Sequence, residues 1–142
     1  MLFSGMCKLA IKSVIYIATS FDQLLTIKDI SEHLEASEHT IAKILQVLSK
    51  HEIICSLKGV HGGFFMTEEQ CQFPILKIVK LIDGEGLLNQ CVLGLSQCNA
   101  KKPCPLHEEY VKAKYVIEGI LTKKSIAEFA ALVNKGQFNL AN

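Results

Sequence analysis

The sequence predicts a mainly helical fold that carries one small β-hairpin and one long helix in its second half. Apolar residues recur at helical spacing through most of the chain, and a glycine-rich turn at 58–63 separates two short β-prone runs. A cysteine-rich segment at 87–105 divides the later helices. The expected order is helix, helix, helix, hairpin, helix, cysteine loop, long helix and short helix.

Length and composition are those of an ordinary globular protein. The chain has 142 residues, of which 49% are hydrophobic, so it can bury one core of normal domain size. No apolar run approaches the roughly 20 residues that a membrane span needs. The apolar start of the chain is interrupted by Lys8 and Lys12 and lacks a small-residue cleavage site. We therefore expect a cytoplasmic protein without a membrane partner, beginning with an amphipathic helix over about 4–19.

Two short helices joined by a tight turn are expected after the first helix. Thr26 with Asp29 has the pattern of a capping box, and Ser37 begins a second helix a few residues after the first one ends. Each helix has one apolar face. The apolar residues are Ile27, Ile30 and Leu34 in the first and Ile41, Ile44, Leu45 and Leu48 in the second. This pattern is typical of a helix-turn-helix, although any helical hairpin would share it.

The β-hairpin that follows favours the helix-turn-helix interpretation. Residues 53–57 and 64–66 are β-prone, and Gly59, Gly62 and Gly63 lie in the intervening turn, where positive φ angles are needed. A hairpin in this place is a wing, so the predicted fold class is a winged helix-turn-helix. We expect Lys58 and His61 to meet a phosphate backbone or a minor groove of double-stranded DNA.

Charge gives only local support to DNA binding. The net charge is +1, and all fifteen basic residues are lysine, so the bidentate contacts of arginine are absent. The acidic Glu32, Glu35 and Glu38 weaken the electrostatic case. The candidate DNA-binding residues are Ser37, His39, Thr40, Lys43, Lys58 and His61.

The second half of the chain predicts a dimerisation helix. Pro74 begins a helix that Gly84 and Gly86 end, and a longer helix covers about 107–122. Its apolar stripe, in near-heptad spacing, consists of Tyr110, Ala113, Ile117, Ile120 and Leu121. The stripe fits a two-stranded seam, and packing against the chain's own domain is the alternative. Ser125 and Glu128 form a capping box for a last short helix that ends near residues 134–136.

Three cysteines and a histidine form the most specific motif. Cys91, Cys98, Cys104 and His107 are separated by six, five and two residues. Three thiolates in a flexible segment suit a soft metal centre. Structural zinc usually uses cysteine pairs two to four residues apart, which this segment lacks, so the wider spacing favours an iron–sulfur cluster. Zinc and three unligated thiols remain the alternatives.

The other candidate ligands each have a second interpretation. His107 begins the long helix and is a candidate fourth ligand, with a solvated first-turn histidine as the alternative. Cys55 and Cys71 are expected as small buried side chains, whereas Cys7 is also a candidate to approach the cluster of a partner. No catalytic constellation and no glycine-rich phosphate loop is present, so we do not expect an enzyme.

With these motifs the chain resembles the IscR/NsrR-type family of winged-helix regulators over nearly its whole length. The resemblance is carried by FSGMCKLAIKSVIYIA, LSKHEIICSLKGVHGGF, ILKIVKLIDGEG and, above all, CVLGLSQCNAKKPCPLHEEY. It implies a homodimer on a palindromic operator, with a [2Fe-2S] or a [4Fe-4S] cluster under each wing; we favour [2Fe-2S]. It also implies that Cys91, Cys98 and Cys104 ligate iron and that His107 is the histidine ligand of members that use one.

The chain departs from this family at two places. Lys58 stands where the wing usually presents arginine, and Met6-Cys7-Lys8 stands where nitric-oxide-sensing members can carry an acidic ligand. The expected function is a DNA-binding transcriptional repressor that senses an iron–sulfur cluster, nitric oxide or redox state. The alternative is a cluster-free winged-helix regulator controlled by thiol chemistry, zinc or a protein partner. We expect one compact unit: a DNA-binding domain at 1–86, a cluster-binding loop at 87–107, and the dimerisation helix and last short helix at 108–142.

Overall fold

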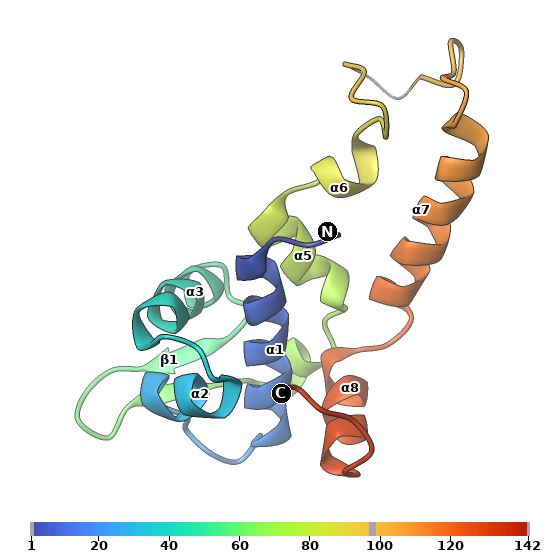
Figure 1. Ribbon diagram of the computed structural model, residues 1–142. Coiled ribbons are helices and arrows are strands. Elements are labelled where there is room, and N and C mark those ends of the chain that lie inside the picture. Colours follow the sequence, from blue (N-terminus) through green and yellow to red (C-terminus); the bar gives the residue numbers. More distant parts are fainter. Residues whose placement is uncertain (1, 97–98, 142) are drawn as a thin grey trace.

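The computed structural model describes residues 2–96 and 99–141, and their helices pack around a central first helix with a two-stranded hairpin at one side (Figure 1). In chain order the elements are α1 (Gly5–Thr19), α2 (Ile27–Leu34), α3 (Glu38–Lys50), β1 (Cys55–Leu57), β2 (Gly63–Phe65), α4 (Glu68–Cys71), α5 (Ile75–Asp83), α6 (Gly86–Asn89), α7 (His107–Thr122) and α8 (Ile126–Asn134). The predicted fold class, mainly α with a hairpin wing and a long helix, is confirmed.

Helix α1 is the centre of the core. It packs against α2, α3, α5 and α8, and its residues Cys7, Ala10, Val14 and Ile17 are fully buried. Burial of the larger aliphatic side chains, Val14 and Ile17, contributes about 1.5–3 kcal/mol each. Because α1 contacts both the helix-turn-helix and the later helices, it joins the two halves of the molecule.

The wing is shorter than the sequence pattern predicts. β1 and β2 pair antiparallel with Cys55 opposite Phe65 and Leu57 opposite Gly63. Ile53 and Ile54, expected in the first strand, are instead buried just before it, with 1% of each side chain exposed. The segment before α2 adds a third partner, because Leu25 and Phe64 exchange backbone hydrogen bonds of 3.0 and 2.8 Å. The hairpin is thereby fixed beside α2.

Two single-turn helices, α4 and α6, were not expected. Thr67 caps α4 by accepting from the Gln70 backbone, and the Gln70 side chain closes a capping box. Helix α6 follows α5 and covers the start of the cysteine-rich region, and the residues between α6 and α7 are hereafter the cysteine segment. Four-residue helices show no apolar periodicity, so sequence patterning does not detect them.

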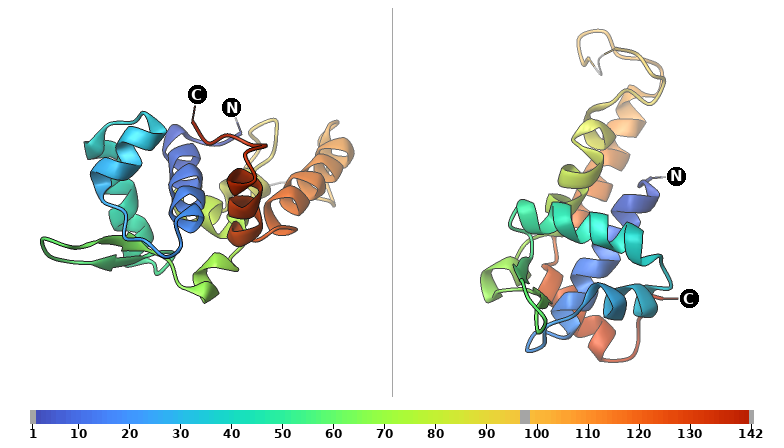
Figure 2. Two further views of the ribbon diagram at one scale, coloured as in Figure 1. Left: turned by 90° about the horizontal axis from the view of Figure 1, so that it is seen from below. Right: turned by 90° about the vertical axis from the view of Figure 1, so that its left-hand side faces the viewer.

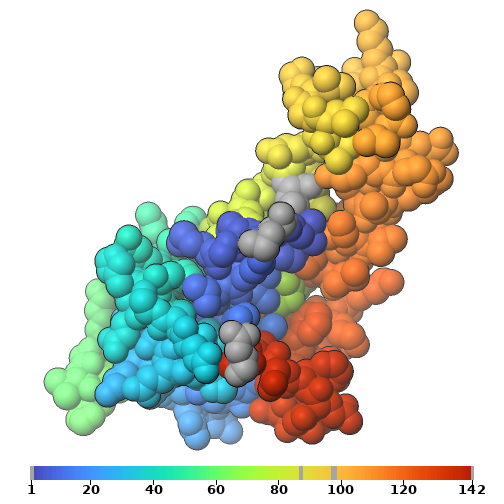
Figure 3. All heavy atoms as spheres, viewed as in Figure 1, coloured from blue at the N-terminus to red at the C-terminus, as the bar shows by residue number. Residues whose placement is uncertain are grey.

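The later helices project the cysteine segment away from the core. α5 and α6 rise on one side and α7 descends on the other, so the segment between α6 and α7 lies at the far end from α8 (Figures 1 and 2). The space-filling view shows the same extension beyond the main body (Figure 3). Where the later helices meet the main body, the backbone N–H of Ile126 donates to the Phe73 carbonyl at 3.0 Å. This hydrogen bond joins the start of α8 to the start of α5. No helix in the described part of the chain is long and apolar enough to cross a membrane.

Candidate nucleic-acid interface and candidate metal centre

Local capping positions the helix-turn-helix. The Thr26 hydroxyl accepts from the Asp29 backbone at 3.1 Å, and the Asp29 carboxylate accepts from the Thr26 backbone at 2.8 Å. Hydrogen bonding of the Asp29 carboxylate to the Thr26 backbone N–H, and next to the Thr26 hydroxyl, lowers the pKa of Asp29. Ser37 caps α3 by accepting from the Thr40 backbone at 3.1 Å. Glu35 ends α2 with a φ of 52°, the left-handed conformation that turns the chain toward α3.

Helix α3 buries one face and presents the other to solvent. Ile41, Ile44, Leu45 and Leu48 are fully buried, as the apolar stripe predicted. His39 and Lys43 are exposed on the opposite face. Thr40 is half-buried, and its hydroxyl lies 2.8 Å from the Ser37 hydroxyl, so both predicted side chains also belong to the helix cap. His39 and Lys43 are therefore the predicted α3 side chains with the freest access to a partner.

Glycine makes the wing tip. A side chain at Gly62 would overlap the Leu57 carbonyl oxygen, and Gly59 has a φ of 110°. The Gly62 N–H donates to the Gly59 carbonyl at 3.0 Å and closes the turn. Lys58 and His61 are exposed, as expected, and Val60 at the tip is 97% exposed. The wing thus projects a cation and an apolar side chain past the body of the protein.

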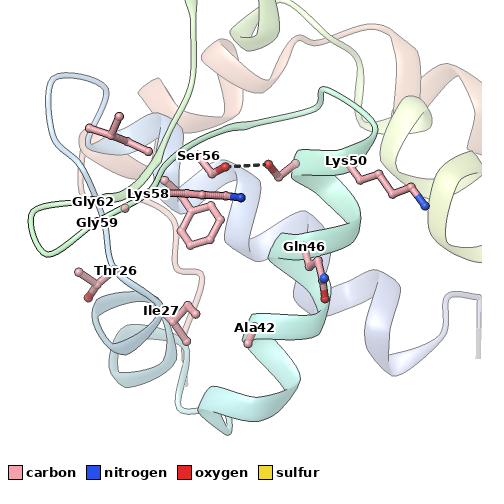
Figure 4. A pocket seen from close by; sticks show the side chains of 13 residues that line it. Thr26, Ile27, Ala42, Gln46, Lys50, Ser56, Lys58, Gly59 and Gly62 are labelled. Carbon is pink, nitrogen blue, oxygen red and sulfur yellow. Dashed lines mark hydrogen bonds between the residues drawn. The ribbon is translucent and has the colours of Figure 1, made fainter.

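A groove separates the wing from the second half of α3 (Figure 4). It encloses about 750 Å³. The groove is lined by Thr26, Ile27, Ala42, Gln46, Ser49, Lys50, Ser56, Leu57, Lys58, Gly59, Gly62, Gly63 and Phe64. Lys58 extends from the wing toward α3, and the Ser49 hydroxyl donates to the Ser56 hydroxyl at 3.2 Å (Figure 4). Two lysines and several hydroxyl and amide groups make it a suitable track for a phosphate backbone.

Sequence reasoning missed Gln46, Ser49 and Lys50 as candidate DNA contacts. They lie on the last two turns of α3, where no sequence pattern distinguishes them from ordinary solvated residues. Their significance comes from the wing that folds over this end of the helix. The polar face of α3 can be recognised in the sequence. The position of the hairpin over the end of that helix cannot, because it depends on the tertiary fold.

The cysteine segment brings Cys91 and Cys104 together. Cys91, which follows α6, is 8% exposed, and Cys104, which precedes α7, is half-buried. The backbone N–H groups of Leu93 and Leu95 hydrogen-bond to the Cys91 sulfur and lower its pKa. The Cys104 side chain and the charge of Lys114 act in the same direction. Because the loop itself, rather than a dense core, covers Cys91, these contacts outweigh its desolvation.

Of the other two predicted ligands, the structure describes only His107. Cys98 lies outside the described residues. His107 is the first residue of α7, is half-buried, and donates its backbone N–H to the Cys104 carbonyl at 3.0 Å. Within 2–96 and 99–141, no three His, Cys, Asp or Glu side chains gather closely enough to hold a metal ion. The described part of the motif is thus a pair of adjacent thiols beside the start of α7.

This donor set fits a thiolate-ligated centre. Two cysteines in contact, one with its thiolate form favoured by N–H donors, are soft ligands of the kind that iron–sulfur clusters and zinc take. N–H groups that point at cysteine sulfur are also a means by which proteins tune such centres. Beside Cys104 and His107 a hollow of about 560 Å³ extends along the first turns of α7.

The remaining described cysteines lie elsewhere. Cys7 is fully buried in α1, and burial, reinforced by the Asp83 carboxylate, raises its pKa to about 12. Cys71 is buried and its pKa is also raised by burial, whereas Cys55 is half-exposed rather than buried as expected. A protonated thiol enclosed by its own chain is poorly disposed to ligate a partner's metal.

The predicted dimer stripe on α7 divides between two environments. Leu121 is 6% exposed and belongs to the chain's own core, against which Ile117 also packs. Ile120 is 61% exposed, beside the unpredicted Val116 at 64% and Tyr115 at 71%. Ala113 is exposed, and Tyr110 is half-buried, with the Lys114 amine 4.9 Å from its ring centroid. Ile120, Val116 and Tyr115, hereafter the α7 apolar face, leave large apolar side chains in solvent.

These features define a winged helix-turn-helix protein with a cysteine-bearing segment carried on a long helix, the build of a DNA-binding transcriptional regulator. The chain belongs to the Rrf2 family, whose model, described as an iron-dependent transcriptional regulator, matches residues 3–132. Regulators of this family bind DNA and typically dimerise.

Individual proteins agree with this assignment. A putative HTH-type transcriptional regulator of Aquifex aeolicus is 26% identical over 140 residues, covering 97% of each chain. The solved structure of the global cysteine regulator CymR of B. subtilis has a TM-score of 0.74 at 15% identity and covers 91% of this chain and 95% of its own. IscR of T. potens has a TM-score of 0.73 at 18% identity, covering 96% and 90%. At these identities the two structures establish the shared fold.

Proposed function

We propose that this protein is a homodimeric repressor whose affinity for a palindromic operator depends on an iron–sulfur cluster bound by Cys91, Cys98 and Cys104. The observation that carries the proposal is the contact between Cys91 and Cys104 beside the start of α7, with backbone N–H groups favouring the Cys91 thiolate. His107 is the proposed fourth ligand, and [2Fe-2S] is the proposed type. Such a cluster supplies a centre whose state changes with redox conditions or with nitric oxide.

The chain's own residues divide the work of binding DNA. His39 and Lys43 on α3 face a major groove, and Ser37 and Thr40 hold the start of that helix while offering hydroxyl groups. Lys58 and His61 are the wing residues that contact the neighbouring phosphate backbone or minor groove of the DNA. Because lysine provides a point charge rather than a planar fork, Lys58 contributes affinity more than base preference.

The cysteine segment influences DNA binding through its position. It connects α6 to α7, and the α7 apolar face is the proposed dimer surface. A segment closed around a cluster fixes the direction in which α7 leaves it. That direction sets the spacing of the two recognition helices, which must match half-sites about 34 Å apart.

A cluster-free regulator is the second candidate. The lowered pKa of Cys91 beside the Cys104 thiol also suits reversible thiol chemistry, because a thiolate is the attacking species in disulfide formation. The fold shared with CymR, which is named as a cysteine regulator, is compatible with this function. Control by zinc or by a protein partner belongs to the same alternative.

The colour of the purified protein separates the two candidates. Protein prepared under anaerobic conditions is analysed by visible absorption and for iron, acid-labile sulfide and zinc. The proposal predicts brown protein with stoichiometric iron and sulfide. Colourless protein without iron, after anaerobic purification and an attempted cluster reconstitution, would contradict it and favour the cluster-free regulator.

A further inference from the structure

One carboxylate joins the end of α5 to the beginning of α1. Asp83, the last residue of α5, accepts from the Ser4 backbone N–H at 2.9 Å through Oδ2 and from the Ser4 hydroxyl through Oδ1. The Ser4 hydroxyl in turn accepts from the Cys7 backbone N–H at 3.0 Å and caps α1. A negative charge at this end of a 15-residue helix is also favoured by the helix dipole.

Asp83 lies at the point where the cysteine segment leaves the body. Gly84 follows it with φ 76° and ψ −175°, a conformation that is essentially limited to glycine. Glu85 and the single turn of α6 then lead to Cys91. Asp83 is thus the last residue before this turn, and the contacts that hold Asp83 fix the point from which 84–90 leaves α5.

Cys7 contacts the same carboxylate. Its side chain is fully buried, hydrogen-bonds to Asp83 and stays protonated, with a pKa raised to about 12 by burial and by the Asp83 charge. Three groups at the start of α1 therefore hydrogen-bond to Asp83: the Ser4 backbone N–H, the Ser4 hydroxyl and the Cys7 thiol.

The other end of the cysteine segment is also fixed to the body. Helix α7 leads to α8, whose first residue, Ile126, is hydrogen-bonded to Phe73 just before α5. A change in the segment between α6 and α7 therefore acts at two fixed points, the base of α8 and Asp83. Helix α1 packs against both α8 and α5, and Asp83 adds hydrogen bonds to the start of α1, which packs directly against the recognition helix α3.

We propose that Asp83 and Ser4 form a latch that couples the cysteine segment to the DNA-binding half of the molecule. Asp83 is a positioning residue in this role: it acts through Ser4 and the first turn of α1. The latch holds the first turn of α1 to the end of α5, so a change in how 84–90 leaves α5 reaches α1 and, through it, α3. The inference rests on the proposed function for its biological meaning, and its mechanical part is tested without a cluster.

Hydrogen exchange of the apo protein tests the mechanical part. Reporter amides are those of Cys7 in α1, bonded to Ser4, and of Leu88 and Gln90 near α6, bonded to Glu85 and Gly86. Asp83→Ala should accelerate exchange in both groups by about tenfold, since a hydrogen bond to a charged group is lost. Glu85→Ala is the matched control, because it removes a nearby carboxylate whose exposed ion pair with Lys80 spans 3.9 Å.

A simple cap would behave differently. Acceleration confined to the first turn of α1, or in neither group, would overturn the latch. Ser4→Ala keeps the backbone contact to Asp83 but removes the acceptor of the Cys7 amide itself, so its informative reporters are Leu88 and Gln90, where it should give a smaller acceleration than Asp83→Ala. It also provides the test if Asp83→Ala does not fold.

Operator affinity of cluster-loaded and apo dimers tests the coupling. If loading changes the affinity of the wild type by a typical roughly 5–150-fold, Asp83→Ala should keep the cluster absorption but reduce this ratio to within about twofold, whereas Glu85→Ala should retain it. A wild-type ratio kept in Asp83→Ala would overturn the latch. A wild-type ratio of one would instead overturn the cluster-sensing function, and the exchange result would still decide the latch.

Discussion

Gln70 is a buried polar residue that holds the base of the wing. Its side-chain oxygen accepts from the Thr67 backbone at 3.0 Å and from the Cys55 thiol at 3.5 Å, and its side-chain nitrogen donates to the Glu52 carbonyl at 3.0 Å. Replacement by an apolar residue leaves these groups without their partner. Glu52 has a φ of 59°, a strained conformation for a residue other than glycine. The hydrogen bond from Gln70 satisfies the carbonyl group of this residue.

We expect Gln70→Leu to reduce the free energy of unfolding by about 1–3 kcal/mol, the cost of a buried hydrogen-bonding group left unsatisfied. Chemical denaturation measures the change. The control is Gln72→Leu, an exposed glutamine beside the same short helix, which should change stability by less than about 0.5 kcal/mol. Equal effects of the two substitutions would show that the Gln70 contacts do not stabilise the fold.

Lys58 is the residue by which the wing meets phosphate in our account. Lys58→Ala should weaken binding to all DNA sequences alike and lower the salt dependence by about one phosphate contact. Lys112→Ala, on α7 and paired with Glu109 at 2.9 Å, is the control and should leave the slope unchanged. Gel-shift titrations at several salt concentrations measure both. An unaltered slope in Lys58→Ala would mean that the wing does not touch the backbone.

The cysteine segment is expected to act as one element. Each proposed ligand closes the same site, so Cys91→Ala, Cys98→Ala or Cys104→Ala should each abolish cluster retention rather than reduce it by a third. Iron and sulfide analysis of anaerobically purified variants measures this. Cys55→Ala, which removes a thiol at the wing, should keep a full cluster. A stoichiometric cluster in any of the three ligand variants would remove that cysteine from the assignment.

Helix α7 has one side in the core and one in solvent, and the two sides should respond differently to substitution. Ile120→Glu, at a 61% exposed position, should convert a dimer to a folded monomer because it puts a charge into the α7 apolar face. Leu121→Ala, at a 6% exposed neighbour, should instead cost about 2–5 kcal/mol of stability. Sedimentation velocity and thermal unfolding distinguish them. A dimeric Ile120→Glu protein would exclude this face as the interface.

Features that a few neighbouring residues encode, such as helix caps, could be predicted from the sequence. Features that depend on tertiary contacts between distant residues could not. The caps at Thr26, Ser37 and Ser125 are encoded within four residues, and all three are present. The separation of Leu121 from Ile120 depends on where α5 lies against α7, which periodicity does not specify. The role of Asp83 likewise depends on Ser4, a residue distant in sequence that only the tertiary fold brings close.

At the scale of the whole molecule, two surfaces are joined by α1. The groove between α3 and the wing lies at one side, and the cysteine segment lies at the far end of α6 and α7 (Figures 1 and 4). The family model matches residues 3–132 and so spans both surfaces, and that family's regulators bind DNA and typically dimerise. Sequence reasoning identified the cysteine motif, but the distance between the two surfaces and their connection through α1 required the fold.

The central claim is that the occupant of the cysteine segment sets the affinity for the operator. Coupling of this kind is reciprocal: whatever factor the cluster contributes to DNA affinity, DNA must contribute to cluster retention. Removing the cluster should therefore weaken operator binding, and bound operator should slow cluster loss.

The most direct measurement is the operator affinity of cluster-loaded and apo protein, each confirmed as a dimer, at one salt concentration. The account predicts that the loaded protein binds roughly 5–150-fold more tightly, which corresponds to about 1–3 kcal/mol of coupling. Equal affinities of the two dimers would contradict it and leave the metal centre with a purely structural role.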